Sequence, residues 1–318
     1  MAERIIRRRQ PPLPVRDGLN PSRVQLPRDA EPITARDFIL HLVRTQTHKS
    51  PEDNEASVDE RFARGEVMDP RGRRYAPDEL IQPGADVWFY RKPGPERHIP
   101  FDIPILFQDE NLLVADKPAF LATMPRGRHI TETATVRLRR ATGNQDLSPA
   151  HRLDRLTSGV LVFTTRPEVR GAYQDIFAER RAHKTYEAIA PYNANIAPGT
   201  VWENRIEKIR GIVQAKIIDG APNALTEVVN VERLPDGVYA RYTLAPKTGR
   251  THQLRLHMNA AGAPILGDPL YPELLPLADE CFSNPLRLLA RELSFRDPFT
   301  GEMRVFRSQR TLSPEPSQ

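Results

Sequence analysis

Cysteine and long apolar runs are nearly absent from this chain. Its 318 residues include one cysteine, Cys281, so an internal disulfide and a Cys/His zinc framework are both excluded. No apolar run reaches the roughly 18 residues that a membrane helix needs. The arginine-rich start of the chain continues into Gln10-Pro11-Pro12-Leu13-Pro14, where a signal peptide would have its apolar segment. These absences predict a cytoplasmic protein that neither spans a membrane nor binds a metal.

Several catalytic motifs are also missing. There is no Gly-Lys-Ser/Thr, which excludes a phosphate-binding P-loop. Lys247-Thr248-Gly249 is like the Lys-Thr-Gly of serine β-lactamases, but their Ser-x-x-Lys does not occur. His252 and His257 are not at the i, i+4 spacing of a zinc-binding helix, and Arg255 between them would repel a cation. Ser158 lacks the glycine of a nucleophile elbow, because Leu156 occupies that position.

The composition is that of a folded, basic protein. Hydrophobic residues make up 39% and charged residues 27%, which is typical of a globular chain. The formal net charge of +5 favours a polyanionic partner.

The chain divides into three parts. Residues 1–30 combine four arginines near the start with prolines and no hydrophobic periodicity, which indicates a flexible basic arm. Residues 31–92 form a small domain, and the Pro/Gly-rich stretch from Lys92 to Glu96 predicts a linker. Residues 93–318 then form one larger domain.

Hydrophobic spacing predicts the elements within these parts. Helices are expected at 33–43 with Thr34 as N-cap, at 58–64 and at 167–182. Strands are expected at 86–90, in a hairpin over 104–118, and at 184–190, 224–234 and 238–244. Because few long helices separate these strands, the sequence predicts an α+β fold with a mixed, mainly antiparallel sheet.

Three segments combine the residue types of an active site. In His151-Arg152-Leu153-Asp154-Arg155-Leu156-Thr157-Ser158-Gly159-Val160, Asp154 lies close to two arginines, whose charge favours an ionised carboxylate. In Lys184-Thr185-Tyr186-Glu187-Ala188, a strand would place Tyr186 and the small Ala188 on one face, leaving room for a flat ligand. In Pro246–His257, Thr251 is expected as a helix N-cap, Leu254 and Met258 share a face, and Arg255 lies on another.

These segments resemble the motifs of the RluA-type pseudouridine synthases, enzymes that isomerise uridine within RNA. The match includes His151–Val160, Lys-x-Tyr-x-Ala at 184–188 and Pro-x-Thr-Gly-Arg-x-His-Gln-Leu-Arg-x-His from Pro246, followed by Gly262-Ala263-Pro264-Ile265 and Gly267-Asp268. It spans roughly Ile105 to Phe306 and implies the pseudouridine synthase fold. Residues 31–92 are similar to a small RNA-binding domain, named after a ribosomal protein, that many of these enzymes carry.

The resemblance implies the roles of the site residues. Asp154 is expected to be the catalytic carboxylate, Tyr186 to stack on the target base, and Arg255 to pair with Asp154. Either Tyr186 or water would remove the C5 proton. Residues expected to bind the RNA substrate are Arg126, Arg128, Arg152, Arg155, Lys184, Arg250 and His252. The expected partner is structured RNA, with rRNA favoured over tRNA, and the expected enzyme is a cofactor-free, monomeric isomerase (an intramolecular transferase).

Two departures from the family pattern bear on the substrate. Leu289 stands where the family usually has a histidine, and Met124-Pro125-Arg126-Gly127-Arg128 replaces a common Val-His-Pro. Two other functions stay open: a non-catalytic RNA-binding protein on the same fold, and a nucleoside hydrolase. The intact Asp154, Tyr186 and Arg255 argue against the first. Neither of the other motifs offers a second catalytic carboxylate near Asp154, which argues against the hydrolase.

Overall fold

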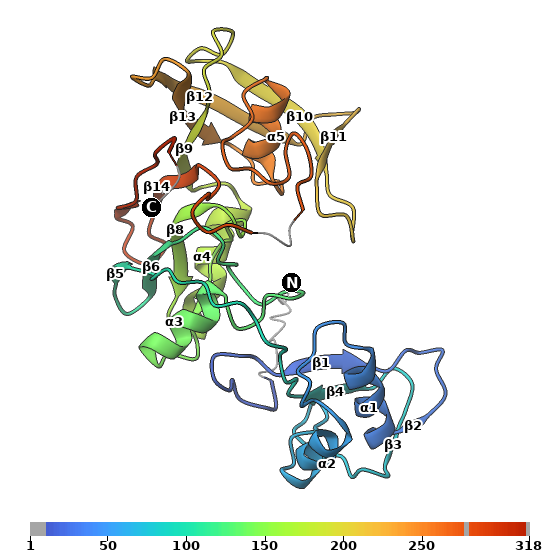
Figure 1. The fold of residues 1–318 in the computed structure, drawn as a ribbon. Helices are drawn as coiled ribbons and strands as arrows, with labels where there is room; N and C mark the ends of the chain where they lie inside the picture. The colour runs from blue at the N-terminus through green and yellow to red at the C-terminus, as the bar shows by residue number, and fades with distance from the viewer. Residues whose placement is uncertain (1–10, 277–279, 316–318) are drawn as a thin grey trace. The chain divides into compact units, whose positions relative to one another are not determined.

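The computed structural model describes residues 11–276 and 280–315 of the chain. The contacts divide the chain into two compact units, and the larger one contains the three motif segments (Figure 1). The smaller unit comprises residues 1–98 and 125–145, and the larger one residues 99–124 and 146–318. Within the described ranges, no helix has the length and apolarity that crossing a membrane would require.

The N-terminal segment of the smaller unit contains two helices and two short strand pairs. α1 (Ala35–Thr45) begins at Thr34, whose side chain accepts a hydrogen bond from the Asp37 amide, as predicted. α2 (Glu55–Ala63) begins three residues earlier than expected, because Asn54 and Ser57 form a reciprocal capping box. The strands β1 (Ser22–Gln25) and β4 (Asp86–Phe89) pair antiparallel, as do β2 (Ile33–Thr34) and β3 (Leu80–Ile81).

Residues 11–30 differ from the flexible arm predicted for residues 1–30. β1 belongs to a sheet, Leu13 and Leu26 are buried, and the Tyr90 hydroxyl donates to the Pro14 carbonyl at 2.8 Å. The apolar side chains in this segment are too sparse to show a period, but they complete the core of the small unit. The prediction for residues 1–10 lies outside the described residues.

The linker expected around Lys92–Glu96 is also more ordered than its composition indicates. The Glu96 carboxylate accepts hydrogen bonds from the backbone amides of Ile130, Thr131 and Glu132. These residues lead into α3 (Ala134–Thr142), a helix that the sequence patterns did not identify. The smaller unit therefore draws on two separate segments of the chain, whereas the sequence predicted one continuous domain ending at residue 92.

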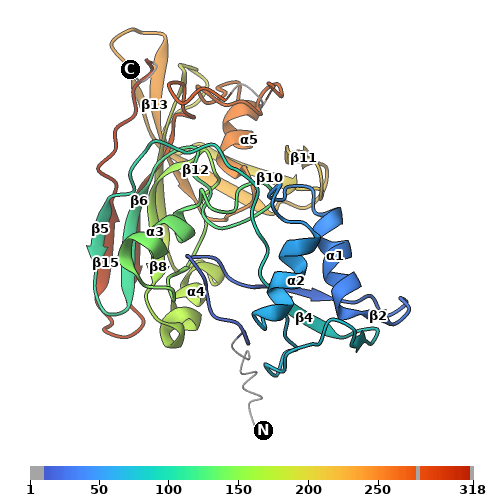
Figure 2. The same cartoon turned by 60° about the horizontal axis from the view of Figure 1, so that its bottom comes forward.

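The larger unit is built on one long mixed sheet. Figures 1 and 2 show it running from β11 and β10 at one end to β5 and β6 at the other. Its order is β11-β10-β12-β13-β9-β14-β8-β6-β5, with β15 on β14 and β7 on β8. The bounds are β5 Ile105–Gln108, β6 Leu112–Lys117, β7 Ser148–Pro149, β8 Ser158–Thr164, β9 His183–Pro191, β10 Val201–Glu207, β11 Lys216–Ile218, β12 Ala224–Arg233, β13 Tyr239–Pro246, β14 Leu288–Arg296 and β15 Met303–Arg307.

The pairing confirms the predicted fold class. The hairpin of β5 and β6 is antiparallel, and so is every other pair of this sheet within the described residues, except β8 with β14. At that parallel step Gly159 lies opposite Ala290 with a φ of 112°. A Cβ atom on Gly159 would lie 2.3 Å from the Ala290 carbonyl oxygen, so this position requires glycine.

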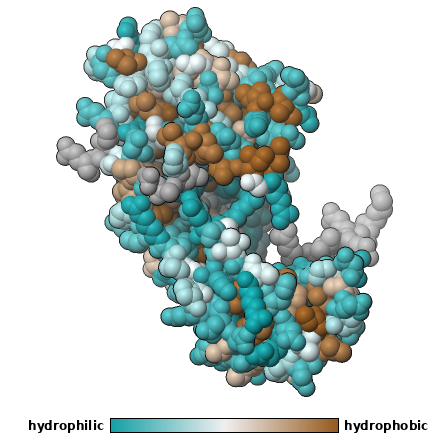
Figure 3. Space-filling model, turned by 45° about the vertical axis from the view of Figure 1, so that its right-hand side comes forward, coloured by the Kyte–Doolittle hydropathy of each residue, from teal (hydrophilic) through white to brown (hydrophobic). Residues whose placement is uncertain are grey.

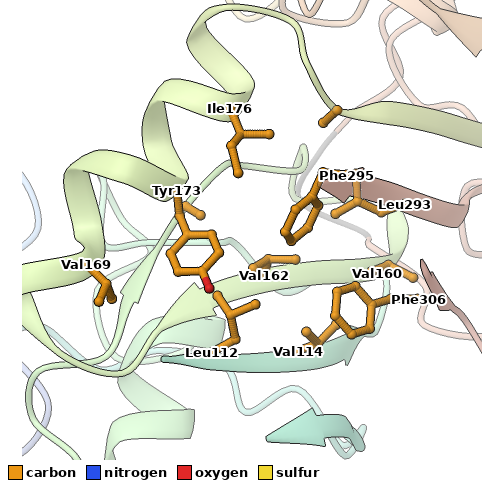
Figure 4. Packing of buried hydrophobic residues seen from close by; sticks show 12 residues of the cluster. Leu112, Val114, Val160, Val162, Val169, Tyr173, Ile176, Leu293, Phe295 and Phe306 are labelled. Carbon is orange, nitrogen blue, oxygen red and sulfur yellow. The ribbon is translucent and has the colours of Figure 1, made fainter. Parts of the chain in front are cut away.

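One helix covers the core of this sheet. The helix predicted at 167–182 is a single 3₁₀ turn, η1 (Pro167–Val169), followed by α4 (Arg170–Ala178). Figure 4 shows Tyr173 and Ile176 of α4 directed toward Val162 and Phe295 of the sheet. The Tyr173 hydroxyl donates to Asp297 at 2.9 Å, so its one polar atom is satisfied inside an apolar cluster. Figure 3 shows a surface that is mostly hydrophilic, with separate hydrophobic patches on it.

Candidate active site

The three motif segments meet in one cleft of the larger unit. The cleft has a volume of about 610 Å³, within the range of small-ligand sites. Its lining residues include Arg152, Asp154, Thr157, Gln174, Arg180, Lys184, Tyr186, Arg250, His252, Arg255 and Leu288. Asp154 is the only acidic residue of this lining, whereas five residues of the lining are arginine or lysine. The cleft is thus a basic pocket with a single carboxylate, the combination that the motifs predicted.

The loop that carries Asp154 is fixed on both sides of the carboxylate. It precedes β8 and closes a turn in which the Thr157 amide donates to the Asp154 carbonyl at 3.1 Å. On the N-terminal side, Thr123 Oγ1 accepts from the Leu153 amide at 3.1 Å and donates to the Leu153 carbonyl at 2.9 Å. Leu153 and Leu156 are buried. The backbone around Asp154 is therefore held by packing and hydrogen bonds that leave its side chain in the cleft.

A buried lysine adds a third support to this loop. Lys117, at the end of β6, has no exposed surface, and its Nζ donates to the carbonyls of Pro118, Leu121 and Arg155 at 2.9, 2.8 and 3.1 Å. Burial, followed by the charge of Arg155, lowers the pKa of Lys117 well below its usual value. Its amino group thus connects the first hairpin of the larger unit to the residue after Asp154.

Neither arginine beside Asp154 in the sequence forms an ion pair with it. Arg155 turns away and donates through Nη1 to Glu280 at 2.9 Å and to the Phe120 carbonyl at 3.2 Å. Arg152 is exposed at the cleft and has no hydrogen bond to another described residue. Adjacent residues in an extended loop point in different directions, so closeness in sequence did not produce contact. Arg152 lines the cleft and Arg155 holds the loop.

Arg255 has a different partner from the one expected. Its Nε and Nη2 donate to the two oxygens of Asp268 at 2.8 and 2.6 Å, and both side chains are almost fully buried. No ion pair joins Arg255 to Asp154, although the structure describes both, so the predicted pair is not formed here. The reason is geometric: Asp268 occupies the two-pronged edge of the guanidinium, which leaves only Nη1 without a partner among the described residues.

Electrostatics still connect Arg255 with Asp154. Burial disfavours the guanidinium charge, but hydrogen bonding to Asp268 and its charge, with a smaller contribution from Asp154, raise the pKa of Arg255. Asp268 belongs to the last motif segment, but the sequence alone indicated no role for it. A buried arginine is rarely left without a carboxylate, and that rule would have identified a partner for it.

Tyr186 lies in the middle of the sheet and faces the cleft. It belongs to β9 and pairs with Leu244 on one side and Ala290 on the other. Burial, followed by the charge of Asp154, raises the pKa of its hydroxyl. The phenol is therefore protonated at neutral pH, and its ring is placed by two flanking strands.

His151 is a structural histidine. Its Nε2 accepts a hydrogen bond from the Val162 amide at 3.2 Å, and its ring stacks on Phe177 at 4.4 Å between centroids. Burial, and then the charge of Lys184, lower its pKa to about 3, so the ring is neutral.

The start of α5 (Gln253–Ala260) differs from the prediction. The N-cap is His252 rather than Thr251, and it has no side-chain capping bond. Gln253 instead fixes the preceding loop, since its Oε1 accepts from the Arg250 amide and from Thr248 Oγ1. Arg255 is as buried as Leu254 and Met258, because the whole first part of this helix is inside the protein.

The basic residues of the cleft are largely without acidic partners. Arg152, Arg180 and Lys184 have no ion pair with another described residue, and Arg250 donates through Nε to the Asn223 carbonyl at 3.2 Å. Burial, and then the charge of Arg180, lower the pKa of Lys184. The sequence reasoning missed Arg180, which follows the C-cap Glu179 of α4 and has a left-handed conformation (φ 60°). Nothing in its local sequence pattern distinguished it.

Two predicted RNA-binding residues belong to the other unit. Arg126 and Arg128 lie in a tight turn, in which the Arg126 and His129 backbones form an isolated bridge. Their part in substrate binding stays a prediction. Among the described residues there is no cluster of side chains that could hold a metal ion.

Comparison with known proteins agrees with this site. Residues 111–260 match a family model described as RNA pseudouridylate synthase. The chain is 36% identical to the dual-specificity RNA pseudouridine synthase RluA of Haemophilus influenzae, over 65% of this chain and 93% of that protein. It is 33% identical to tRNA pseudouridine synthase C of Vibrio parahaemolyticus, over 66% of this chain and 91% of that protein.

A solved structure supports the fold. The structure titled Human RNA Pseudouridylate Synthase Domain Containing 1 matches with a TM-score of 0.52 at 24% identity, over 68% of this chain and 86% of that chain. Its likeness concerns the fold alone.

Proposed function

Because the chain belongs to the RluA-type pseudouridine synthases, which isomerise uridine in RNA, we propose that Asp154 is its catalytic carboxylate. One observation carries this assignment: Asp154 is the single carboxylate in a basic cleft to which all three motifs contribute. Its loop is fixed by Thr123 and Lys117, so the carboxylate is held in place before substrate arrives.

The reaction sets what Asp154 must do. The bond from N1 to C1′ breaks, the base turns, a bond from C5 to C1′ forms, and the C5 proton leaves. Asp154 would either attack C1′ or act on the ribose while positive charge develops on the sugar, as carboxylates do in glycoside hydrolysis. No nucleotide or other cofactor takes part in this scheme.

We assign Tyr186 to stacking on the uracil. Its raised pKa keeps the hydroxyl protonated, which disfavours a phenolate acting as the C5 base in the free enzyme. Stacking on an aromatic ring contributes about 1–3 kcal/mol per base. Water is then the favoured acceptor for the C5 proton.

Arg255 would support the site from behind. With Asp268 on one edge of its guanidinium, Arg255 keeps a fixed positive charge in the same cleft as Asp154. Arg152, Arg180, Lys184 and Arg250 would receive phosphates next to the extruded nucleotide, and His252 would contact that nucleotide. Arg126 and Arg128, in the smaller unit, would bind RNA phosphates.

The first test is substitution of the carboxylate. Asp154→Asn removes the charge but keeps the shape, so we expect release of tritium from RNA carrying [5-³H]uridine to fall by roughly three orders of magnitude, ~4 kcal/mol of barrier. RNA binding should remain near that of the wild type. Activity within about tenfold of wild type would overturn the assignment.

The RNA substrate can be identified in cells. One relative is named a dual-specificity RNA pseudouridine synthase and another a tRNA pseudouridine synthase. We propose that this enzyme acts in the cytoplasm as a monomer on structured RNA, with rRNA favoured. Pseudouridine mapping across all RNA of a strain that lacks the gene, with and without the wild-type protein supplied again, would show which uridines depend on it. Sites in tRNA alone would reject the rRNA assignment.

A further inference from the structure

His252 lies in the cleft on a backbone conformation that few side chains adopt. Its φ is 59°, in the left-handed region, directly before α5. Its carbonyl accepts the Leu256 amide at 2.9 Å, so the helix fixes this residue in place. Uncommon conformations of this kind occur where a side chain is held for function. The chemistry that His252 offers to a ligand depends on which of its two ring nitrogens carries the proton.

The hydrogen-bond partners of the Tyr271 hydroxyl determine which nitrogen of His252 is protonated. The Tyr271 hydroxyl oxygen accepts from the Ala215 amide at 2.8 Å, lies 3.0 Å from the Ala215 carbonyl oxygen, and lies 2.9 Å from Nδ1 of His252. The hydroxyl has one proton. Ala215 is buried, and no other described donor reaches its carbonyl. Giving the proton to His252 would leave that buried carbonyl unpaired, which costs free energy.

The hydroxyl proton is therefore donated to Ala215, and Nδ1 of His252 must carry a proton that it donates to Tyr271. Burial lowers the pKa of His252 to about 4, against an opposing contribution from Asp154, so the ring is neutral. A neutral ring with its proton on Nδ1 has a lone pair on Nε2. This nitrogen has no hydrogen bond to any residue in the described part of the chain, and the side chain lines the cleft.

We propose that Nε2 of His252 accepts a hydrogen bond from the uridine being isomerised. This inference rests on the proposed function and makes its site more specific. Within an RNA chain the 3′ and 5′ oxygens are phosphate esters, so a uridine has two donors left: the imide N3–H and the ribose 2′-hydroxyl. An acceptor held next to Asp154 selects for a nucleotide that presents one of these groups. Tyr271 is then a positioning residue, since it sets the tautomer without touching the substrate.

The tautomer can be measured without any RNA. Nitrogen NMR of the full-length protein labelled at histidine distinguishes a protonated ring nitrogen from an unprotonated one, and His252→Asn identifies the signals by their loss. We expect the proton on Nδ1 in the wild type and a mixture of tautomers in Tyr271→Phe. A proton on Nε2 in the wild type would overturn the proposal, whether or not the protein isomerises uridine.

The substrate contact is tested with analogues in the mapped RNA target. We compare kcat/KM for uridine, 2′-deoxyuridine and N3-methyluridine at that position. Wild type should discriminate against at least one analogue by roughly tenfold or more, as loss of one hydrogen bond predicts. Asparagine tolerates the left-handed backbone, so His252→Asn should fold normally. This variant should lose the discrimination against that analogue and keep any discrimination against the second analogue. The analogue concerned identifies the donor.

His183→Ala is the matched control, because His183 is exposed on β9 and does not line the cleft. It should keep the wild-type ratios. Unchanged ratios in His252→Asn, or a wild type indifferent to both analogues, would reject the contact. A wild type inactive on unmodified RNA would instead reject the proposed function, while the NMR result would still decide the tautomer.

Discussion

At the scale of single residues, the cleft separates groups that hold the site from groups that face it. Asp154, Tyr186 and Lys184 face it, whereas Lys117 and Asp268 are buried and act on their neighbours. The holding residues make short hydrogen bonds with little exposure to water, so their removal should affect stability as well as activity. Substitutions of the facing residues should leave stability nearly unchanged.

Tyr186 offers a test of this separation. Tyr186→Phe keeps the ring, and we expect it to retain RNA binding and bond cleavage, because the protonated hydroxyl is not used as a base. Tyr186→Leu should weaken both, by about 1–3 kcal/mol in binding. Filter binding and single-turnover tritium release check the two effects. If Tyr186→Phe accumulated a rearranged intermediate, the tyrosine hydroxyl and not water would be the group that removes the C5 proton.

The buried pair of Arg255 and Asp268 predicts a strong stability coupling. Removing either partner alone leaves a buried charge without compensation, which costs about 3–5 kcal/mol. We expect Arg255→Met and Asp268→Leu each to reduce the free energy of unfolding in urea by an amount of this order. The double variant should recover part of the loss. A cycle that combines Arg255→Met with Asp154→Asn should show little coupling in stability. A strong coupling would mean that Arg255 does pair with Asp154, as the sequence predicted.

At the scale of elements, the sequence located strands and helices better than it located contacts. Alternation and caps predicted α1, β9 and the hairpin of β5 and β6, because these elements depend on neighbours in the chain. The sequence of α3 is Ala-Thr-Val-Arg-Leu-Arg-Arg-Ala-Thr. α3 was not predicted, because its sequence has few apolar residues and its burial depends on distant segments. For the same reason the partner of Arg155 could not be predicted, since Glu280 lies 125 residues along the chain. Asp268, the partner of Arg255, lies only 13 residues away within the same motif region.

The parallel step between β8 and β14 gives the element-scale prediction. A Cβ on Gly159 would collide with the backbone of Ala290, which cannot move aside as a side chain could, and the φ of 112° disfavours any other residue. We expect Gly159→Ala to lower stability by several kcal/mol and to reduce activity by displacing the Asp154 loop, ~1–3 kcal/mol arising from backbone strain alone. Urea unfolding and tritium release measure the two effects.

Gly171 in α4 is the matched control. A Cβ there would meet no atom within 4 Å, and the residue lies within a regular helix. Gly171→Ala should therefore stabilise the protein by roughly 0.4–1 kcal/mol, since alanine has less conformational freedom to lose on folding. If the two substitutions changed stability equally, the close approach of β8 and β14 would not be the cause.

At the scale of the whole molecule, the charged residues of the surface and those of the cleft have different roles. Most ion pairs lie on the surface, where each contributes little to stability. Apart from Arg255, which pairs with Asp268, the cations that line the cleft have no acidic partner among the residues the structure describes. The net charge of +5 should therefore contribute to binding RNA more than to stability, and RNA binding should weaken as the salt concentration increases.

Stability of the larger unit should depend on pH through its buried histidines. The pKa of His151 falls to about 3, and those of His252 and His257 to about 4, in each case chiefly by burial, against 6.5 for an ordinary histidine. Between these values the unfolded chain binds more protons than the folded one. Stability is then fully present above pH 6.5 and is lost as the pH falls toward 4.

His257 allows this to be tested at one position. Both of its ring nitrogens are buried without a hydrogen-bond partner among the described residues, its ring forms a T-shaped contact with Trp202, and it does not line the cleft. His257→Leu removes two unsatisfied polar atoms, so we expect stability at pH 7.5 to be unchanged or higher. Urea unfolding at pH 7.5 and pH 5 should show a smaller loss in this variant than in the wild type. An equal loss would mean that His257 does not titrate as its burial requires.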